Sequence, residues 1–453
     1  MKLYSENKYY KLYRGNMLDM LENIEPGSID SIVTDPPYEL NFMNKWWDNS
    51  GIAFNSETRK KCLDVLKPGG YLLAFGGSRT FHRIAVAIED AGFEIRDTIM
   101  RLYGSGFPKS LNIGLAIDKK NGIDNRTGNL VEWVGSNNTL SMRNGLTESM
   151  EFKSEYEERK ATNERSGRWT ALKPSYEPII VARKPFKWSC IDNVLENWVG
   201  GINIDECRVG AEEQIEKGRN GRNNKSTFQA SEVNNIEREY QNNWRFPANT
   251  ILTYNEEDFN EVCGGFPYTK STGGSWIASQ INTFKNVKMW VNGKNTWQHL
   301  GGLWDEWSAS RYFYCAKASK RDRDEWLEEF EENLGGGMLG TQNQSLLTGS
   351  GNIRNNLRKN THPTVKPTDL MQYLVRLVTP KWWTVLDPFN WSGSTWKAVM
   401  YENIDRNKDY KYIGIELTEE YLPIAKARIE YVINKEEKKS EEEKWERKEE
   451  ALF

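Results

Sequence analysis

Short apolar runs alternate with amphipathic segments over the first part of the chain and again toward its C-terminal end. The apolar runs predict strands at residues 29–34, 71–75, 93–100, 176–182, 384–389 and 412–416. Apolar positions at helical spacing predict helices at residues 56–66, 81–91, from 397 onward and at 419–431. Strands that alternate with helices tend to pair in parallel, so the pattern predicts an α/β fold with a doubly wound, Rossmann-like, mostly parallel sheet.

The first of these strands ends in Asp35-Pro36-Pro37-Tyr38. Prolines cannot continue a sheet ladder, so the chain must leave the sheet there. A carboxylate and an aromatic ring then stand at the carboxyl end of a strand, where open α/β sheets bind ligands. Asp35 and the carbonyl of Pro36 could accept the hydrogens of an exocyclic amine and activate its nitrogen. Tyr38 could stack on an extruded base. The alternative is a strand-end turn with an incidental carboxylate.

A later strand ends in a similar way, at Asp387-Pro388-Phe389. A tight turn containing Ser392-Gly393 follows and leads into a helical pattern. The order strand, turn, helix presents backbone N–H groups to a ligand. The next strand ends on Glu416, and a carboxylate at that place can accept both hydroxyls of a ribose.

These segments together resemble the motifs of site-specific DNA amino-methyltransferases, which use S-adenosylmethionine. Asp35-Pro36-Pro37-Tyr38 resembles the catalytic motif, residues 387–395 the cofactor loop, and Gly414-Ile415-Glu416 the ribose-binding strand end. His362-Pro363-Thr364-Val365-Lys366-Pro367 resembles a segment whose helix closes over the methionine end of the cofactor. The catalytic motif precedes the cofactor motif, which is the permuted order called beta class. The resemblance runs from about residue 12 to residue 431 and is weakest in the middle.

The resemblance implies a permuted methyltransferase fold, S-adenosylmethionine as cofactor, double-stranded DNA as partner and no metal. It implies that the catalytic residues are Asp35, Pro36, Pro37 and Tyr38. It implies that the cofactor is bound by Thr364, Lys366, Asp387, Phe389, Ser392, Gly393 and Glu416. Aspartate at position 35 favours adenine N6, because enzymes that methylate cytosine N4 more often carry serine there.

Several alternatives remain open at this point. The chain could be a relative that binds DNA without catalysing, or it could methylate cytosine N4. Related enzymes that methylate RNA or a protein glutamine use Asn-Pro-Pro-Tyr-like motifs, but the large middle insertion favours DNA. The oligomeric state and the existence of a cognate restriction enzyme are both open, and neighbouring genes would identify such an enzyme.

The composition divides the chain into five parts. Residues 1–186 hold the catalytic half, with a mobile insertion at about 110–165, and residues 187–330 form an inserted target-recognition region. Residues 331–360 are a flexible linker, 361–433 the cofactor-binding half and 434–453 a charged tail. Basic residues in the middle region are candidate phosphate contacts, with solvated surface as the alternative: Lys217, Arg219, Arg222, Lys320 and Arg321.

Charge and cysteine usage narrow the function further. The net charge is −3, so any DNA contact must come from a local basic face. Five scattered cysteines form no close pair, which argues against a zinc site and a disulfide framework. None of them follows a proline, which removes the nucleophile used to methylate cytosine carbon-5. Nothing resembles a signal peptide or an apolar run of about 18 residues, so we expect a cytoplasmic protein without a membrane partner.

Tryptophan stands at several positions where the family usually has glycine: Trp391, Trp382-Trp383 and Trp396, with Trp169 and Trp326 similar. Glycine serves there for positive φ or close backbone approach. Three readings compete: the strain is absorbed and activity kept, the protein binds DNA without catalysing, or glycine codons are recoded or misread. We expect the Trp391 indole to occupy the cofactor pocket, and Trp391→Gly together with Trp396→Gly to restore binding.

Overall fold

The structure is a computed structural model, and it places two compact units in the chain. It describes residues 2–40, 46–103, 110–122, 163–210, 244–254, 268–270, 306–308, 313–317, 321–325, 327, 330, 333–334, 357–362 and 365–433. One unit comprises Met1–Ser105 and Tyr176–Phe453, and the other comprises Gly106–Ser175.

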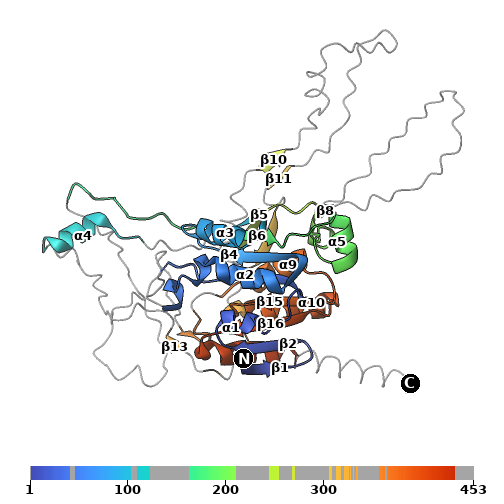
Figure 1. Cartoon of the computed structure of the whole chain (residues 1–453). Coiled ribbons are helices and arrows are strands. Elements are labelled where there is room, and N and C mark those ends of the chain that lie inside the picture. The colour runs from blue at the N-terminus through green and yellow to red at the C-terminus, as the bar shows by residue number, and fades with distance from the viewer. Residues whose placement is uncertain are drawn as a thin grey trace, which may run out of the picture. The chain divides into compact units, whose positions relative to one another are not determined.

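The larger unit is built on a ten-stranded sheet in the order β1-β2-β16-β15-β3-β4-β6-β5-β9-β12 (Figure 1). Its strands are β1 (Lys2–Glu6), β2 (Tyr10–Arg14), β3 (Ile29–Thr34), β4 (Leu66–Phe75), β5 (Glu94–Tyr103), β6 (Tyr176–Arg183), β9 (Thr250–Tyr254), β12 (Tyr314–Lys317), β15 (Thr384–Asp387) and β16 (Lys411–Glu416). β1 and β6 run antiparallel to their neighbours, and the other neighbouring strands pair in parallel. The predicted mostly parallel sheet is confirmed.

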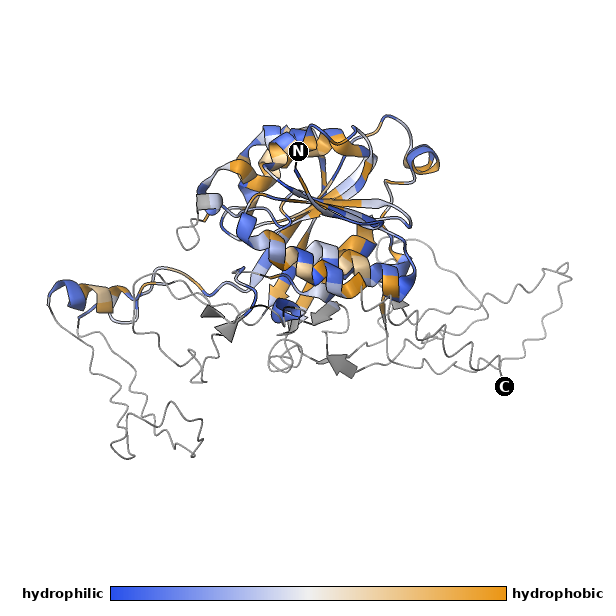
Figure 2. Cartoon of the chain, turned by 90° about the horizontal axis from the view of Figure 1, so that it is seen from below, coloured by the Kyte–Doolittle hydropathy of each residue, from blue (hydrophilic) through white to orange (hydrophobic). Residues whose placement is uncertain are grey.

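Helices cover both faces of this sheet. One face carries α1 (Met17–Leu21), α2 (Ser56–Val65) and α3 (Phe81–Asp90), and the other carries α9 (Thr368–Val378), α10 (Ser394–Arg406) and a helix at residues 422–433. Successive residues of a strand point to opposite faces, so Ile32 packs with the first group of helices and Val33 with the second. Figure 2 shows the largely hydrophobic strands between the two helical layers. The predicted doubly wound fold is therefore confirmed.

The β6 strand changes the strand order that simple alternation predicts. Residues 66–75 and 94–103 follow each other in the sequence with a helix between them, but β6 inserts between β4 and β5 and is antiparallel to both. The strand predicted at 71–75 also begins earlier, at Leu66, because the chain continues through Pro68 and Gly69 with a register shift against β3. Gly69 has φ +85°, which glycine adopts without strain.

The region predicted to recognise the DNA target contributes to the same sheet. β9 pairs in parallel with β5, and β12 pairs in parallel with β9. The larger unit also contains the helices α5 (Cys190–Asn197) and α8 (Arg321–Asp324). Three short antiparallel pairs lie outside the main sheet: β7 (Val209–Gly210) with β8 (Trp244–Arg245), β10 (Tyr268–Lys270) with β11 (Glu306–Ser308), and β13 (Asn333–Leu334) with β14 (Leu357–Arg358). The 3-10 helices are η2 (Trp46–Asn49), η3 (Ile52–Phe54), η5 (Asp205–Cys207) and η7 (Glu419–Tyr421).

The smaller unit contains α4 (Ile113–Lys120), which lies in the predicted insertion. Asn112 caps this helix, and the side chain of Asn163 donates to Gly114 and Asp118. Most of the predicted insertion, the predicted linker and the charged tail lie outside the described residues. In the described part of the chain, no helix is both long and apolar enough to cross a membrane.

Candidate active site

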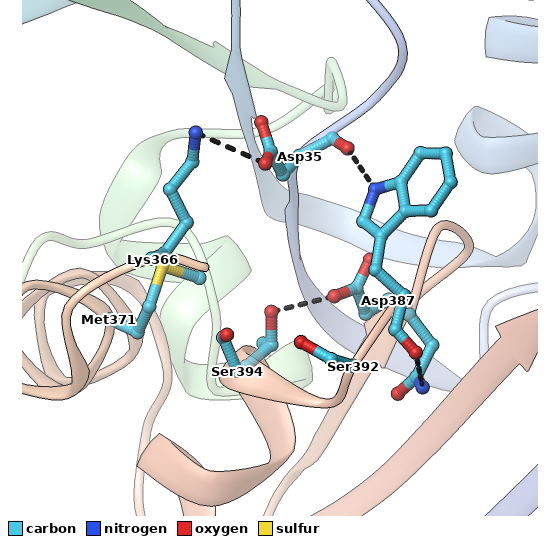
Figure 3. A pocket seen from close by; sticks show the side chains of 9 residues that line it. Asp35, Lys366, Met371, Asp387, Ser392 and Ser394 are labelled. Carbon is cyan, nitrogen blue, oxygen red and sulfur yellow. Dashed lines mark hydrogen bonds and ion pairs between the residues drawn. The ribbon is translucent and has the colours of Figure 1, made fainter. Parts of the chain in front are cut away.

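The carboxyl ends of β3 and β15 meet at a small pocket, beside the end of β16 (Figure 3). The residues that line it include Asp35, Lys366, Met371, Asp387, Trp391 and Ser392. Lys366 reaches toward Asp35 on one side, and Asp387 and Ser392 lie on the other. The cavity has a volume of about 10 Å³, which is room for roughly one water molecule.

Asp387 connects three elements at the edge of the sheet. Its Oδ1 accepts hydrogen bonds from the Thr34 hydroxyl at 2.7 Å and from the Phe389 N–H at 3.1 Å. Its Oδ2 accepts one from the Thr395 hydroxyl at 2.6 Å. Burial raises the pKa of Asp387 to about 7, and these hydrogen bonds oppose the rise. Asp387 therefore fastens the end of β15 to the end of β3 and to the first turn of α10.

The loop after Asp387 lies tightly on β16. The amide oxygen of Asn390 accepts from the Tyr412 hydroxyl at 2.8 Å, directly over Gly414. A Cβ at position 414 would lie 2.7 Å from the same Asn390 oxygen, so a glycine is needed there. Gly393, with φ +78°, then turns the chain into α10. These contacts explain why the predicted cofactor loop has its strand–turn–helix shape.

Glu416 ends β16 as a buried carboxylate. Its Oε2 accepts from the Trp391 N–H at 2.6 Å, and its Oε1 accepts from the Thr418 N–H at 2.7 Å. Burial raises the pKa of Glu416 to about 8, although these backbone donors oppose it. Each carboxyl oxygen has two lone pairs, so Glu416 still has acceptor capacity for hydroxyl groups of a ligand.

Asp35 lies immediately after β3, and its two carboxylate oxygens differ. Oδ2 is 3.1 Å from the Lys366 ammonium. Oδ1 is buried and has no hydrogen-bond partner among the described residues. Burial raises the pKa of Asp35 above its usual range, while the charge of Lys366 lowers it. A buried acceptor atom without a hydrogen-bond donor is unusual, because buried polar atoms normally have a partner.

Tyr38 is fixed from two sides. Its hydroxyl donates to Glu177 at 2.5 Å and accepts from the Lys366 ammonium at 2.9 Å. The Asp48 carboxylate accepts from the backbone N–H of Tyr38 at 2.9 Å and also from the next two N–H groups, and the Thr80 hydroxyl donates to the Tyr38 carbonyl at 2.8 Å. The segment after the two prolines therefore has a defined position beside the pocket.

The Trp391 indole lies at the pocket, as predicted. Residue 391 has φ +47°, in the left-handed region that favours glycine. The indole Nε1 donates to the Asp35 carbonyl at 2.7 Å. The ring centroid lies 4.7 Å from that of Trp47 and 5.2 Å from that of His362. The side chain therefore connects the two strand ends across the pocket.

The other tryptophans predicted to replace glycines have different environments. Trp382 has φ +70° and is 63 % exposed. Trp396 is fully buried between Tyr10 and Tyr412 in the core and does not line the pocket. The sequence predicts that Trp396→Gly helps to restore cofactor binding. The structure gives no steric reason for such a gain, because the indole fills core space that a glycine would leave empty.

Of the remaining predicted site residues, two have contacts in the described part of the chain. Lys366 contacts Asp35 and Tyr38. Ser392 accepts two hydrogen bonds from the buried Arg428, at 2.6 Å on its carbonyl and 3.0 Å on its hydroxyl. Residues outside the described part of the chain are Thr364, Lys217, Arg219, Arg222 and Lys320, and the side chain of Arg321, the first residue of α8.

Sequence reasoning missed Glu177 and Arg428, which contact the two motifs directly. The available signal for Glu177 was an acidic residue inside the otherwise apolar strand predicted at 176–182. Arg428 lies in a helix pattern that gives no such signal. Among the described residues, no three His, Cys, Asp or Glu side chains are grouped as a metal site requires.

Comparison with known proteins places this site in a family. A family model named N6_N4_Mtase and described as DNA methylase matches residues 29–427. The chain therefore belongs to this family of DNA methylases. Both predicted motifs, at Asp35 and at Asp387, lie inside the matched residues.

Individual relatives match over shorter stretches. Type II methyltransferase M.HpaI of Haemophilus parainfluenzae is 33 % identical over 106 residues, 22 % of this chain and 34 % of that protein. Type II methyltransferase M2.LlaDCHI of Lactococcus lactis subsp. cremoris is 27 % identical over 177 residues, 35 % of this chain and 61 % of that protein. The chain thus spans about a third to three fifths of the length of these curated relatives. The solved structure of PvuII DNA methyltransferase (cytosine-N4-specific) aligns at 13 % identity with a TM-score of 0.40, over 94 % of this chain and 90 % of that chain.

Proposed function

We propose that this chain transfers a methyl group from S-adenosylmethionine to N6 of adenine at a specific sequence in double-stranded DNA. The observation that carries the proposal is the open acceptor at the end of β3. Asp35 Oδ1 is buried and has no hydrogen-bond partner in the described residues, and Lys366 holds the other oxygen at 3.1 Å. An exocyclic amine has two hydrogens to donate, and an oriented carboxylate is the acceptor that suits one of them.

The side chains around Asp35 favour amine chemistry. The amine nitrogen of a base is a poor nucleophile because its lone pair is delocalised into the ring. A hydrogen bond to Asp35 Oδ1 would draw the nitrogen toward a tetrahedral geometry and stabilise the positive charge that develops on it. Lys366 orients the carboxylate at 3.1 Å, and its ammonium also lies 5.3 Å from the centroid of the Tyr38 ring. We propose that this ring contacts the extruded base.

S-adenosylmethionine supplies an electrophilic methyl group when it is bound. The polar groups around the pocket suit it: Glu416 can accept ribose hydroxyls, and Asp387, Ser392 and Lys366 lie along the same edge. The space does not suit it, because the Trp391 indole lies between the two strand ends and leaves about 10 Å³. The cofactor can therefore enter only if the indole moves.

That steric conflict supports a second candidate function, a DNA-binding relative that does not catalyse. In both cases we propose that residues 187–330 recognise the target, with Lys217, Arg219, Arg222, Lys320 and Arg321 as phosphate contacts. Methylation of cytosine N4 remains the alternative reaction, because the family name covers both amines.

The test compares Asp35→Ala with the unmodified chain and with Asp19→Ala, an exposed aspartate on α1 as the control. Each substitution is made in the chain as it stands and in Trp391→Gly. Transfer of labelled methyl groups to a mixed-sequence plasmid should fall by at least about 100-fold in Asp35→Ala, while DNA binding stays within about twofold. Unchanged turnover would contradict the role of Asp35. A 4-methylcytosine product would overturn the adenine assignment, and absence of transfer in every variant would favour the second candidate.

A further inference from the structure

One buried carboxylate beside the pocket belongs to neither sequence motif. We infer that Glu177 is a positioning residue of this site, which holds Lys366 and Tyr38 in place and so keeps one oxygen of Asp35 open for the amine. The inference rests on the proposed function for the identity of the amine. The contacts of Glu177 are observed in the structure whatever the substrate is.

The antiparallel direction of β6 brings Glu177 to the site. Ile179 of β6 pairs with Phe75, the last residue of β4. Glu177 lies two residues before Ile179, so it extends beyond the end of β4. A parallel strand in the same place would have presented its last residues at this edge. The first residues of β6 lie there instead, beside the carboxyl ends of β3 and β4.

Glu177 uses both of its oxygens. Oε1 accepts from the Tyr38 hydroxyl at 2.5 Å and from the Lys366 ammonium at 2.9 Å. Oε2 accepts from Arg101 at 2.6 Å, and Arg101 is the residue directly opposite Glu177 on β5. The Glu177 side chain is only 12 % exposed, so these charge-assisted bonds are protected from water.

Lys366 therefore lies between two carboxylates. Its ammonium is 3.1 Å from Asp35 and 2.9 Å from Glu177, and its charge serves both. If Glu177 lost its charge, the ammonium would have a single carboxylate to pair with and would move onto Asp35. The Asp35 oxygens would then bind Lys366 instead of a substrate amine.

Glu177 is suited to this role because it remains ionised. Burial raises the pKa of Glu177, but Lys366 and Arg101 outweigh burial and hold that pKa at about 2. When Asp35 and Glu177 are both ionised, their negative charges balance the positive charges of Lys366 and Arg101, so the group buries no net charge. A simple structural role, in which Glu177 and Arg101 only tie β6 to β5, would not require the contacts to Tyr38 and Lys366.

The decisive experiment measures the pKa of the Asp35 carboxyl group in Glu177→Gln. Aspartate labelled with ¹³C at Cγ is followed by NMR over pH in the full chain, and Asp35→Asn identifies the signal. The charged and titratable groups that face Asp35 are Lys366, Glu177, Tyr38 and Asp387. Glu177→Gln removes the nearest like charge and leaves Lys366 to Asp35 alone. The Asp35 pKa should fall by on the order of one unit.

Two further variants make the result unambiguous. Glu94→Gln is the matched control, because Glu94 lies on β5 and pairs with Arg183 at 2.7 Å at the other end of the strand, and it should leave Asp35 unchanged. Lys366→Gln should move the Asp35 pKa upward, and it keeps the inference testable if Glu177→Gln does not fold. An unchanged Asp35 pKa in folded Glu177→Gln would overturn the inference, as would a shift in the same direction in Lys366→Gln. None of these measurements needs cofactor or DNA, so their failure would leave the proposed function standing.

Activity provides a second readout once methyl transfer is detectable in Trp391→Gly. In that background Glu177→Gln should lower the rate at the pH optimum by up to about 100-fold, because the acceptor geometry is lost. The acid limb of the rate profile should also move to lower pH, following Asp35. A lower rate with an unmoved acid limb would reduce Glu177 to a structural residue and contradict the inference.

Discussion

The ends of β3 and β15 carry the same dipeptide, yet the two aspartates have different environments. Asp35 faces a cation, Lys366, and keeps one oxygen without a described partner. Asp387 is bound by two hydroxyls and one backbone N–H, and both of its oxygens are used within the fold. Asp-Pro at a strand end therefore positions a carboxylate. The neighbours contributed by other elements decide whether that carboxylate is free for a substrate or holds a loop.

The turns that lead into the two strands also differ, in the type of residue that makes them. Gly27, two residues before β3, has φ +67°, and Trp382, two residues before β15, has φ +70°. The backbone makes the same left-handed turn before each strand. Glycine makes it without strain, but a side chain in this region costs about 1–2 kcal/mol. Trp391, in the loop after β15, likewise combines a large side chain with a positive φ.

The largest expected effect comes from removing the indole at the β15 end. Trp391→Gly should bind S-adenosylmethionine at least about tenfold more tightly than the unmodified chain, for which we expect a Kd weaker than about 1 mM. Calorimetric titration measures both. The reason is that the indole occupies the space between the strand ends and is hydrogen-bonded to Asp35.

Trp396→Gly is the control for this comparison, because the same exchange is made five residues further along the chain, at a side chain that is buried in the core. It should not improve binding, and it should lower the free energy of unfolding by about 3–5 kcal/mol. Tight binding by the unmodified chain would show that the loop tolerates the indole, and the steric argument would then be wrong.

The second effect concerns the buried carboxyl groups at the ends of β15 and β16, which form no ion pair with a described cation. The pKa of Glu416 is raised from 4.5 to about 8 by burial. Between those values the unfolded chain ionises while folded Glu416 stays protonated, so the folded state is progressively destabilised as pH rises. The stabilisation that the folded state gains from protonated Glu416 is fully present below about pH 4.5 and is lost by about pH 8. Its size is on the order of a few kcal/mol.

Glu416→Gln should remove this dependence. Urea denaturation measures the free energy of unfolding of both proteins at each pH. As the pH rises from 5 to 8, the value for the unmodified chain should fall relative to the value for Glu416→Gln. Glu419→Gln, an exposed residue paired with Arg14, should show no such trend. A pH-independent difference for Glu416→Gln would mean that Glu416 is ionised in the folded chain.

The smallest effect should come from the turn before β15. Trp382→Gly should raise the unfolding free energy by about 0.5–1 kcal/mol, since the relief of positive-φ strain exceeds the entropy cost of glycine. Trp188→Gly is the matched control, because Trp188 is 65 % exposed, much like Trp382, and does not have positive φ. A loss of stability in Trp382→Gly would show that its contact with Lys381 outweighs the strain.

Local sequence patterns are sufficient to predict the main features of the fold and the ends of the key strands. The period of the apolar residues depends on near neighbours, so it located β3, β4, β15 and β16 and the helices between them. Asp35 and Asp387 follow buried runs directly, and Pro cannot extend a strand, so their places at the sheet edge followed from local chemistry.

The groups that surround those carboxylates come from distant parts of the chain, so they are known only from the folded protein. Lys366 reaches Tyr38 across 328 residues of sequence, and Tyr38 reaches Glu177 across 139. Local patterns carry no information about such distant partners. The insertion of antiparallel β6 between β4 and β5 brings Glu177 to the site, and strand order depends on packing of the whole sheet. The sequence could therefore place two aspartates at strand ends, but only the assembled sheet could separate the open acceptor from the structural one.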